Sequence, residues 1–243
     1  MLLTNDWLAD NHVDAFAFFL LEQSRLMAEK FHPYLYISPL YRVSINNILI
    51  LFFTLVFPYR TKLLQVYKSY SMDYQIFINH INPVSIQESK LIVLPIIHEK
   101  HWVLLVGKLK EKVWKMYDSL PNPEHKNICH TVVSSNSYFK LYPDYYVYIH
   151  NINFYNVLFV QIKYLHEDTT GCFSSDITKW NVQAVRGIPT QSNDYDCEIF
   201  VCKYMEKAVR RKKPDWNALK DWQKHMPKFR AEFAFFLFLQ TKK

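Results

Sequence analysis

The sequence predicts an α+β fold, with helices flanking a central mixed or antiparallel sheet. Helical patterns near both ends of the chain and a group of strand-like segments between residues 91 and 117 lead to this prediction. Half of the 243 residues are apolar and 21% are charged, proportions that exclude a disordered chain and a coiled coil. No repeat or linker-like segment divides the sequence, so we expect residues 1–243 to form a single domain.

The first element is a helix expected over residues 7–31. Apolar side chains recur in it at intervals of three and four residues, as they do along one face of a helix. These residues are Val13, Phe16, Ala17, Leu20 and Leu21. The apolar run at 48–57 suits either a buried strand or a short core helix. It has about half of the roughly twenty residues that a membrane crossing needs, so we expect no membrane association.

Strands are expected at residues 91–97, 101–106 and 113–117, where aliphatic and aromatic residues lie between polar turns. The polar segment 107–112 joins the last two strands into a hairpin. We therefore expect these three segments to form the centre of the sheet.

The hairpin gives the first chemical indication. A turn centred between Leu109 and Lys110 places His101 directly opposite Asp118. Cross-strand partners have Cβ atoms about 4.5–5.5 Å apart, so the carboxylate would reach the imidazole. The inference depends on the register, because a slip of one residue would put the two side chains on opposite faces. The alternative is an ordinary pair of polar residues at strand ends.

A second helix is expected over residues 196–211, and residues 229–239 are expected to close the core as a helix or a strand. The apolar stripe of the second helix consists of Cys197, Val201, Tyr204, Met205, Ala208 and Val209. Cys197 lies in the first turn, where the positive end of the helix dipole lowers the pKa of a thiol and favours the nucleophilic thiolate. A buried, unreactive thiol is the alternative for Cys197 and the better interpretation for Cys202.

Composition excludes several classes of function. The net charge of +7 favours acidic partners, but it is too small for a nucleic-acid specialist. Three glycines are too few for a glycine-rich phosphate loop. No CxxC pair is present, so we expect neither a metal nor a cofactor, although His125, Cys129 and His130 lie close in sequence. The N-terminus does not resemble a signal peptide, so we expect an intracellular protein, in the nucleus or cytoplasm.

Four blocks of sequence resemble one family. They are WLADNHVDAF at 7–16, HWVLLV at 101–106, YDSL at 117–120 and QSNDYDCEIFVCKYM at 191–205. Together, and with the chain order His, Asp, Cys, they resemble the proteases that process SUMO and related ubiquitin-like modifiers. The resemblance implies a papain-like cysteine protease fold. It also implies a monomeric peptidase or isopeptidase that cleaves after the C-terminal Gly-Gly of SUMO or a related modifier.

The resemblance assigns four residues to catalysis. Cys197 is the nucleophile, His101 is the general base and later acid, and Asp118 orients the imidazole. The side-chain amide of Gln191, together with the backbone N–H of Cys197, stabilises the tetrahedral oxyanion. The spacing of six residues between Gln191 and Cys197 also matches the family.

Three further residues are assigned to substrate binding by the same resemblance. Trp7 and Trp102 correspond to the aromatic pair that confines the Gly-Gly tail in a narrow tunnel, and packing in the core is the alternative for both. Asp10 corresponds to a position that faces the surface of the modifier.

The chain departs from the family pattern in two respects. Glu198 follows the nucleophile where the family has glycine, and its carboxylate is expected to raise the pKa of the thiol while its side chain points to solvent. Residues 45–57 and about 140–166 are foreign to the family, so they are either insertions or unspliced intron sequence. These departures leave an alternative function: a catalytically impaired pseudoprotease that binds the modifier without efficient cleavage.

Overall fold

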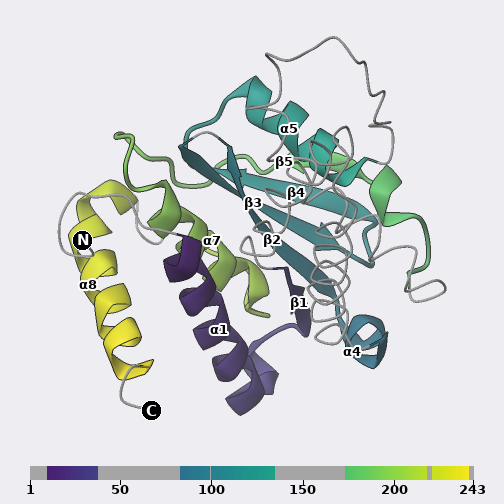
Figure 1. Cartoon of the computed structure of the whole chain (residues 1–243), viewed down its shortest axis with the longest axis horizontal. Helices are drawn as coiled ribbons and strands as arrows, with labels where there is room; N and C mark the ends of the chain where they lie inside the picture. Colours follow the sequence, from purple (N-terminus) through teal and green to yellow (C-terminus); the bar gives the residue numbers. More distant parts are fainter. Residues whose placement is uncertain (1–9, 38–82, 99, 135–172, 218–220, 241–243) are drawn as a thin grey trace, which may run out of the picture. The chain divides into compact units, whose positions relative to one another are not determined.

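The computed structural model describes residues 10–37, 83–98, 100–134, 173–217 and 221–240 (Figure 1). Contacts divide the chain into two compact units. The first unit consists of residues 1–39, 88–130 and 180–243, and the second of residues 40–87 and 131–179. The expectation of one domain over residues 1–243 stays a prediction. The segments 45–57 and 140–166 lie outside the described residues, as do residues 7–9 of the N-terminal block at 7–16.

The first unit contains a five-stranded sheet with the strand order β1-β2-β3-β4-β5 (Figure 1). The strands are β1 (Tyr34–Tyr36), β2 (Leu91–His98), β3 (His101–Lys108), β4 (Val113–Asp118) and β5 (Asn181–Ala184). The three central strands pair antiparallel, whereas β1 and β5 add to the edges in parallel. The sheet is therefore mixed, and the three strands predicted from the sequence form its centre.

The central strands are buried on both faces because their sequences are nearly continuous apolar runs. Side chains of β3 alternate between the faces, and Trp102, Leu104 and Val106 belong to the core cluster that also contains α7 residues. Gly107 lies opposite Trp114 in the neighbouring strand. A Cβ atom at Gly107 would come within 2.8 Å of the Trp114 ring. The glycine is therefore required so that the indole can lie against the backbone.

The predicted hairpin forms, but its predicted register is wrong by two residues. Val103, not His101, lies opposite Asp118. The reason is the turn, which takes in all four residues from Leu109 to Lys112 and ends with Lys112 at a φ of 52°. Because side chains alternate with a period of two, a shift of two residues keeps His101 and Asp118 on the same face.

Helices α1 (Asp10–Leu26), α7 (Cys197–Val209) and α8 (Trp222–Gln240) pack together in the first unit, and α7 lies against β3 (Figure 1). Helix α1 ends earlier than predicted, and a 3₁₀ turn η1 (Ala28–Lys30) follows it. The predicted helix at 196–211 corresponds to α7, and the segment 229–239 is helical within α8.

Helix α5 (Pro123–Val133) follows β4 and was not predicted from the sequence. In the second unit, the described residues include most of α4 (Pro83–Glu88), the end of α5 and the 3₁₀ helix η3 (Ile177–Lys179). None of the described helices is long and apolar enough to cross a membrane.

Replacing Gly107 with alanine tests the close approach of the Trp114 ring. The added methyl group would overlap a fully buried indole, and overpacking of this kind costs about 1–3 kcal/mol. We expect the free energy of unfolding, measured by urea titration, to fall by that amount. Lys110→Ala in the exposed turn is the control and should change it by less than about 0.5 kcal/mol. Equal unfolding midpoints for Gly107→Ala and wild type would contradict the steric argument.

Candidate active site

The ends of two neighbouring strands bring His101 and Asp118 together. Nε2 of His101, the first residue of β3, lies 2.8 Å from Oδ1 of Asp118, the last residue of β4. Burial of Asp118 raises its pKa, but hydrogen bonds from His101, His125 and the backbone N–H of Leu120 outweigh that effect and lower the pKa to about 2. Asp118 is therefore an anion at neutral pH. Because a carboxylate only accepts, Nε2 of His101 carries the proton and Nδ1 is the ring atom that can act as a base.

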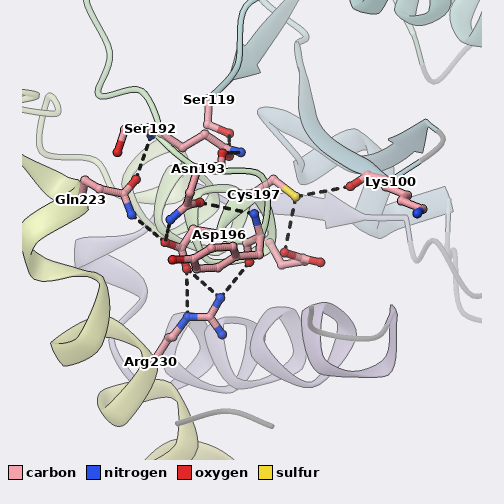
Figure 2. A network of polar contacts seen from close by, with 11 residues as sticks. Lys100, Ser119, Ser192, Asn193, Asp196, Cys197, Gln223 and Arg230 are labelled. Atoms are coloured by element: carbon pink, nitrogen blue, oxygen red, sulfur yellow. Dashed lines mark hydrogen bonds and ion pairs between the residues drawn. The ribbon is translucent and has the colours of Figure 1, made fainter. Parts of the chain in front are cut away.

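Cys197 is the first residue of α7 and is fully buried. Its Sγ lies 3.8 Å from the carbonyl oxygen of Lys100 and 3.4 Å from Oε2 of Glu198 (Figure 2). Both neighbours are acceptors, so the sulfur carries its proton. Within the part of the chain that the structure describes, Sγ makes no hydrogen bond with His101.

We expected the position of Cys197 in the first turn of a helix to lower the pKa of its thiol, and this expectation is wrong. Burial, and after it the charge of Glu198, raise the pKa of Cys197 well above its usual range. Backbone N–H groups of Trp102 and Glu198 act in the opposite direction without balancing them. The resting residue is therefore a neutral thiol, and the expected effect of Glu198 on the pKa has the predicted direction.

The sequence predicted that the Glu198 side chain points to solvent, and this prediction is wrong. The side chain is fully buried, because the first turns of α7 are enclosed on all sides from Cys197 to Cys202. The carboxylate therefore acts on the sulfur through a medium that screens charge poorly, which strengthens its effect on the thiol.

Gln191 is held next to the end of β4. Its Oε1 accepts a hydrogen bond from Ser119 Oγ at 2.7 Å, and its backbone N–H donates to the carbonyl of Ser119 at 2.8 Å. Its Nε2 donates to the carbonyl of Asn193 at 2.6 Å. An amide nitrogen carries two hydrogens, so one remains to donate to an oxyanion. Sequence reasoning missed this role of Ser119, although the residue directly follows Asp118 in the YDSL block.

Asp196, immediately before Cys197, is the centre of a buried polar network (Figure 2). Its Oδ1 accepts from Nε and a terminal nitrogen of Arg230, at 2.9 and 2.6 Å. Its Oδ2 accepts from the side-chain amides of Asn193 and Gln223, at 2.7 and 2.6 Å. Arg230 also donates to the carbonyl of Tyr195 at 2.8 Å. The network thus fixes the segment before Cys197 to helix α8.

Asp196 occupies the N-cap position of α7, yet its side chain makes no capping hydrogen bond because its oxygens are used by the network. The first N–H groups of α7 are therefore not taken by this carboxylate. The Glu198 N–H instead donates to Cys197.

Of the three residues expected to bind substrate, the structure places one completely. Trp102 is 1% exposed and belongs to the same core cluster as Cys197. Trp7 lies outside the described residues, and Asp10 is described only as the first residue of α1, without its side chain. The roles of these three residues in binding stay predictions.

His125 was missed as a site residue. It lies on α5 with Nδ1 2.8 Å from Oδ2 of Asp118, and its ring stacks on that of His101 with centroids 4.6 Å apart.

Among the described residues, His101, Asp118 and His125 form the one group whose three ligand atoms lie close enough, within 4.8 Å, to hold a metal ion. A cation there would have to replace the hydrogen bonds that already join them. Cys129 is buried, and burial raises the pKa of its thiol.

The family model for the Ulp1 protease family, C-terminal catalytic domain, matches residues 61–241 of the chain. The chain belongs to the Ulp1 protease family. It is similar to human Sentrin-specific protease 2, with 25% identity over 155 residues that make up 62% of this chain and 20% of the relative. The chain thus matches only about a fifth of the length of this relative.

Solved structures of the family share the fold. A crystal structure described as the de-sumoylating protease matches with a TM-score of 0.55 and 15% identity, over 99% of this chain and 85% of that one. The C-terminal Ulp1 protease domain in complex with Smt3, the yeast ortholog of SUMO, matches with a TM-score of 0.50 and 14% identity, over 97% and 79%. These matches confirm the α+β cysteine protease fold expected from the sequence.

Arg230→Met tests the network that fixes the segment before Cys197. The variant leaves the buried Asp196 carboxylate without its charged partner, and breaking a buried ion pair from one side costs about 3–5 kcal/mol. Arg210→Met is the matched control, because it removes a half-exposed pair with Glu206 that contributes about 0–1 kcal/mol. Thermal and urea unfolding should separate the two variants clearly. Similar losses in both would show that Asp196 does not depend on Arg230.

Proposed function

We propose that this chain is an active cysteine peptidase or isopeptidase that cleaves after the C-terminal Gly-Gly of SUMO or a related ubiquitin-like modifier. The observation that carries the proposal is the partly buried His101–Asp118 hydrogen bond, in the same unit as a cysteine at the N-terminus of α7. Membership of the Ulp1 family and the solved complex of a relative with Smt3 support this substrate class.

The proposed reaction starts with transfer of the Cys197 proton to Nδ1 of His101, whose charge Asp118 stabilises. The thiolate attacks the carbonyl carbon of the terminal glycine, and the oxyanion accepts hydrogen bonds from the Cys197 N–H and from Nε2 of Gln191. His101 then gives the proton to the leaving amine, and a thioester remains. Water, deprotonated by His101, attacks the thioester and releases the modifier with a free carboxylate.

The surroundings of the thiol make this reaction slow. In the resting state Sγ contacts Lys100 and Glu198, so it has to leave both acceptors before its proton reaches His101. The buried Glu198 carboxylate also opposes formation of the thiolate. This observation favours a second candidate function, a pseudoprotease that binds the modifier without efficient cleavage.

Several properties accompany the proposal. Trp7, Trp102 and Asp10 contact the modifier, whose acidic surface is attracted by the net positive charge of the chain. The protein acts as a monomer in the nucleus or cytoplasm, without a cofactor, a nucleic-acid partner or a membrane.

Cys197→Ser tests the nucleophile. We expect hydrolysis of a fluorogenic SUMO C-terminal amide to disappear while SUMO binding, measured by calorimetry, stays within about threefold, because the thiol does the chemistry and surface contacts supply the affinity. A SUMO vinyl sulfone, whose electrophile traps a competent thiolate, should label the wild type and not the variant. Cys202→Ser, also on α7, is the matched control and should still be labelled. Undiminished turnover in Cys197→Ser would exclude the cysteine mechanism, and SUMO binding by an unlabelled wild type would favour the pseudoprotease.

Glu198→Gly and Glu198→Gln test the charge beside the sulfur. Both remove the carboxylate, while glutamine keeps the size of the side chain. Each unit by which the pKa of Cys197 falls increases the thiolate fraction about tenfold at a pH below both pKa values. We therefore expect kcat/KM at pH 7 to rise in both variants. The gain should stay about constant from pH 6 to 9, because burial, the larger cause, still holds the pKa of the variant's thiol above its usual value. Assays from pH 6 to 9 that show a wild type as fast as both variants would mean that the charge is harmless.

A further inference from the structure

We propose that His125 is a positioning residue of the active site, which holds the Asp118 carboxylate and the His101 ring in the orientation that the reaction needs. The inference rests on the function proposed above, and it concerns a residue that the sequence blocks shared with the family do not include. His125 touches neither the sulfur nor, in this proposal, the substrate. It acts through Asp118 and through the ring of His101.

The two oxygens of Asp118 are divided between two imidazoles. Oδ1 accepts from Nε2 of His101 and from the backbone N–H of Leu120, at 2.8 and 2.9 Å, while Oδ2 accepts from Nδ1 of His125 at 2.8 Å. Rotation of the carboxylate about its Cβ–Cγ bond would break hydrogen bonds on both oxygens at once. A carboxylate held only at Oδ1 would lack this constraint. His125 therefore fixes the plane in which Asp118 meets His101.

The site is closed enough for this hydrogen bond to matter. Asp118 is 4% exposed and His125 is 7% exposed, so water is a poor substitute for a donor that is lost. A buried carboxylate oxygen without a donor carries its full desolvation cost. The lowered pKa of Asp118, about 2, is consistent with a carboxylate whose charged form is held by several donors.

The second contact of His125 is with the ring of His101. The two imidazole planes are 13° from parallel, with centroids 4.6 Å apart. His101 is therefore restrained at Nε2 by the carboxylate and across one face by a flat ring. Tilting of His101, which would move Nδ1 away from an incoming proton, is opposed by both contacts.

Local structure explains how α5 presents His125. The helix starts at Pro123, a residue suited to the first helical position. The Asn122 side chain accepts from the N–H of Glu124 at 3.0 Å, and the Asn122 carbonyl accepts from the N–H of His125 at 3.1 Å. This short turn after β4 brings His125 back to Asp118, only seven residues earlier in the chain. The edge of the His98 ring packs near His125, and His98 in turn lies 3.8 Å from Glu124.

Two variants separate the two contacts. His125→Phe keeps a flat ring against His101 and removes the donor to Asp118, whereas His125→Asn keeps a donor close to the position of Nδ1 and removes the ring. His130→Phe, on the same helix and outside the contacts described for the site, is the control. A hydrogen bond to a charged group is equivalent to about tenfold or more in rate, so we expect His125→Phe to lower kcat by at least that factor. KM should stay within about twofold. His125→Asn should recover most of the loss, and His130→Phe should match the wild type.

A double-mutant cycle with Asp118→Asn tests whether His125 acts through Asp118. If it does, adding His125→Phe to Asp118→Asn should cost little further activity. The same loss in both backgrounds, or a wild-type kcat in His125→Phe, would overturn the proposal. A His125→Phe variant that fails to fold does not end the test, because the cycle can be run with His125→Leu, which also removes the donor to Asp118.

A measurement that does not depend on enzymatic activity separates this proposal from the proposed function. In the inactive Cys197→Ser protein, proton NMR should show two downfield imidazole N–H signals, from His101 and His125, and Asp118→Asn should remove both. His125→Phe should broaden the His101 signal through faster exchange, while His130→Phe should not. If the wild type hydrolyses no modifier and these NMR changes appear, the proposed function fails and the role of His125 stands. An unchanged His101 signal in His125→Phe overturns the role of His125 whatever the activity.

Discussion

The buried ion pair between Asp196 and Arg230 is the interaction on which the arrangement of the site depends. It joins helix α8 to the residue immediately before Cys197, with both side chains almost completely buried. From Asp196 the contacts continue through Asn193 to Gln191, and from Gln191 to Ser119 beside Asp118. One hydrogen-bonded path therefore runs from a C-terminal helix to the end of a central strand. Breaking the path at Asp196 would disturb the positions of Cys197 and Gln191 together.

The strongest conflict in the site is electrostatic. The start of α7 supplies N–H groups that favour a thiolate, and Glu198 places a carboxylate 3.4 Å from the same sulfur. Burial of the thiol is the larger effect against the thiolate and the carboxylate is the second, and together they outweigh the N–H groups. The chain thus combines a His101–Asp118 hydrogen bond with a thiol that is protonated at rest. Whether turnover is slow or absent depends on how easily Sγ leaves this acceptor for His101.

Much of the fold and part of the candidate site could be predicted from the sequence, for physical reasons that differ between elements. The central strands and helix α7 were predictable because long apolar patterns determine them. Strands β1 and β5 were not, since each has only three or four residues and pairs with a segment distant in the chain. The pairing of His101 with Asp118 was predicted with the wrong register and the right face. Glu198 was misplaced because helical periodicity does not say how completely a first turn is enclosed, and His125 was missed because its role depends on the turn before α5.

The hairpin between β3 and β4 has a consequence for how this chain can change in length. His101 and Asp118 meet because an even shift in register leaves both on one face of the sheet. Residues added to the exposed turn at 109–112 would leave the paired strands as they are. A single residue inserted between Val113 and Asp118 would instead turn the carboxylate to the opposite face, unless a bulge absorbed it. The tip of this hairpin therefore tolerates changes in length, whereas β4 does not. Related sequences can keep the histidine–aspartate pair only if insertions or deletions in β4 leave both side chains on the same face of the sheet.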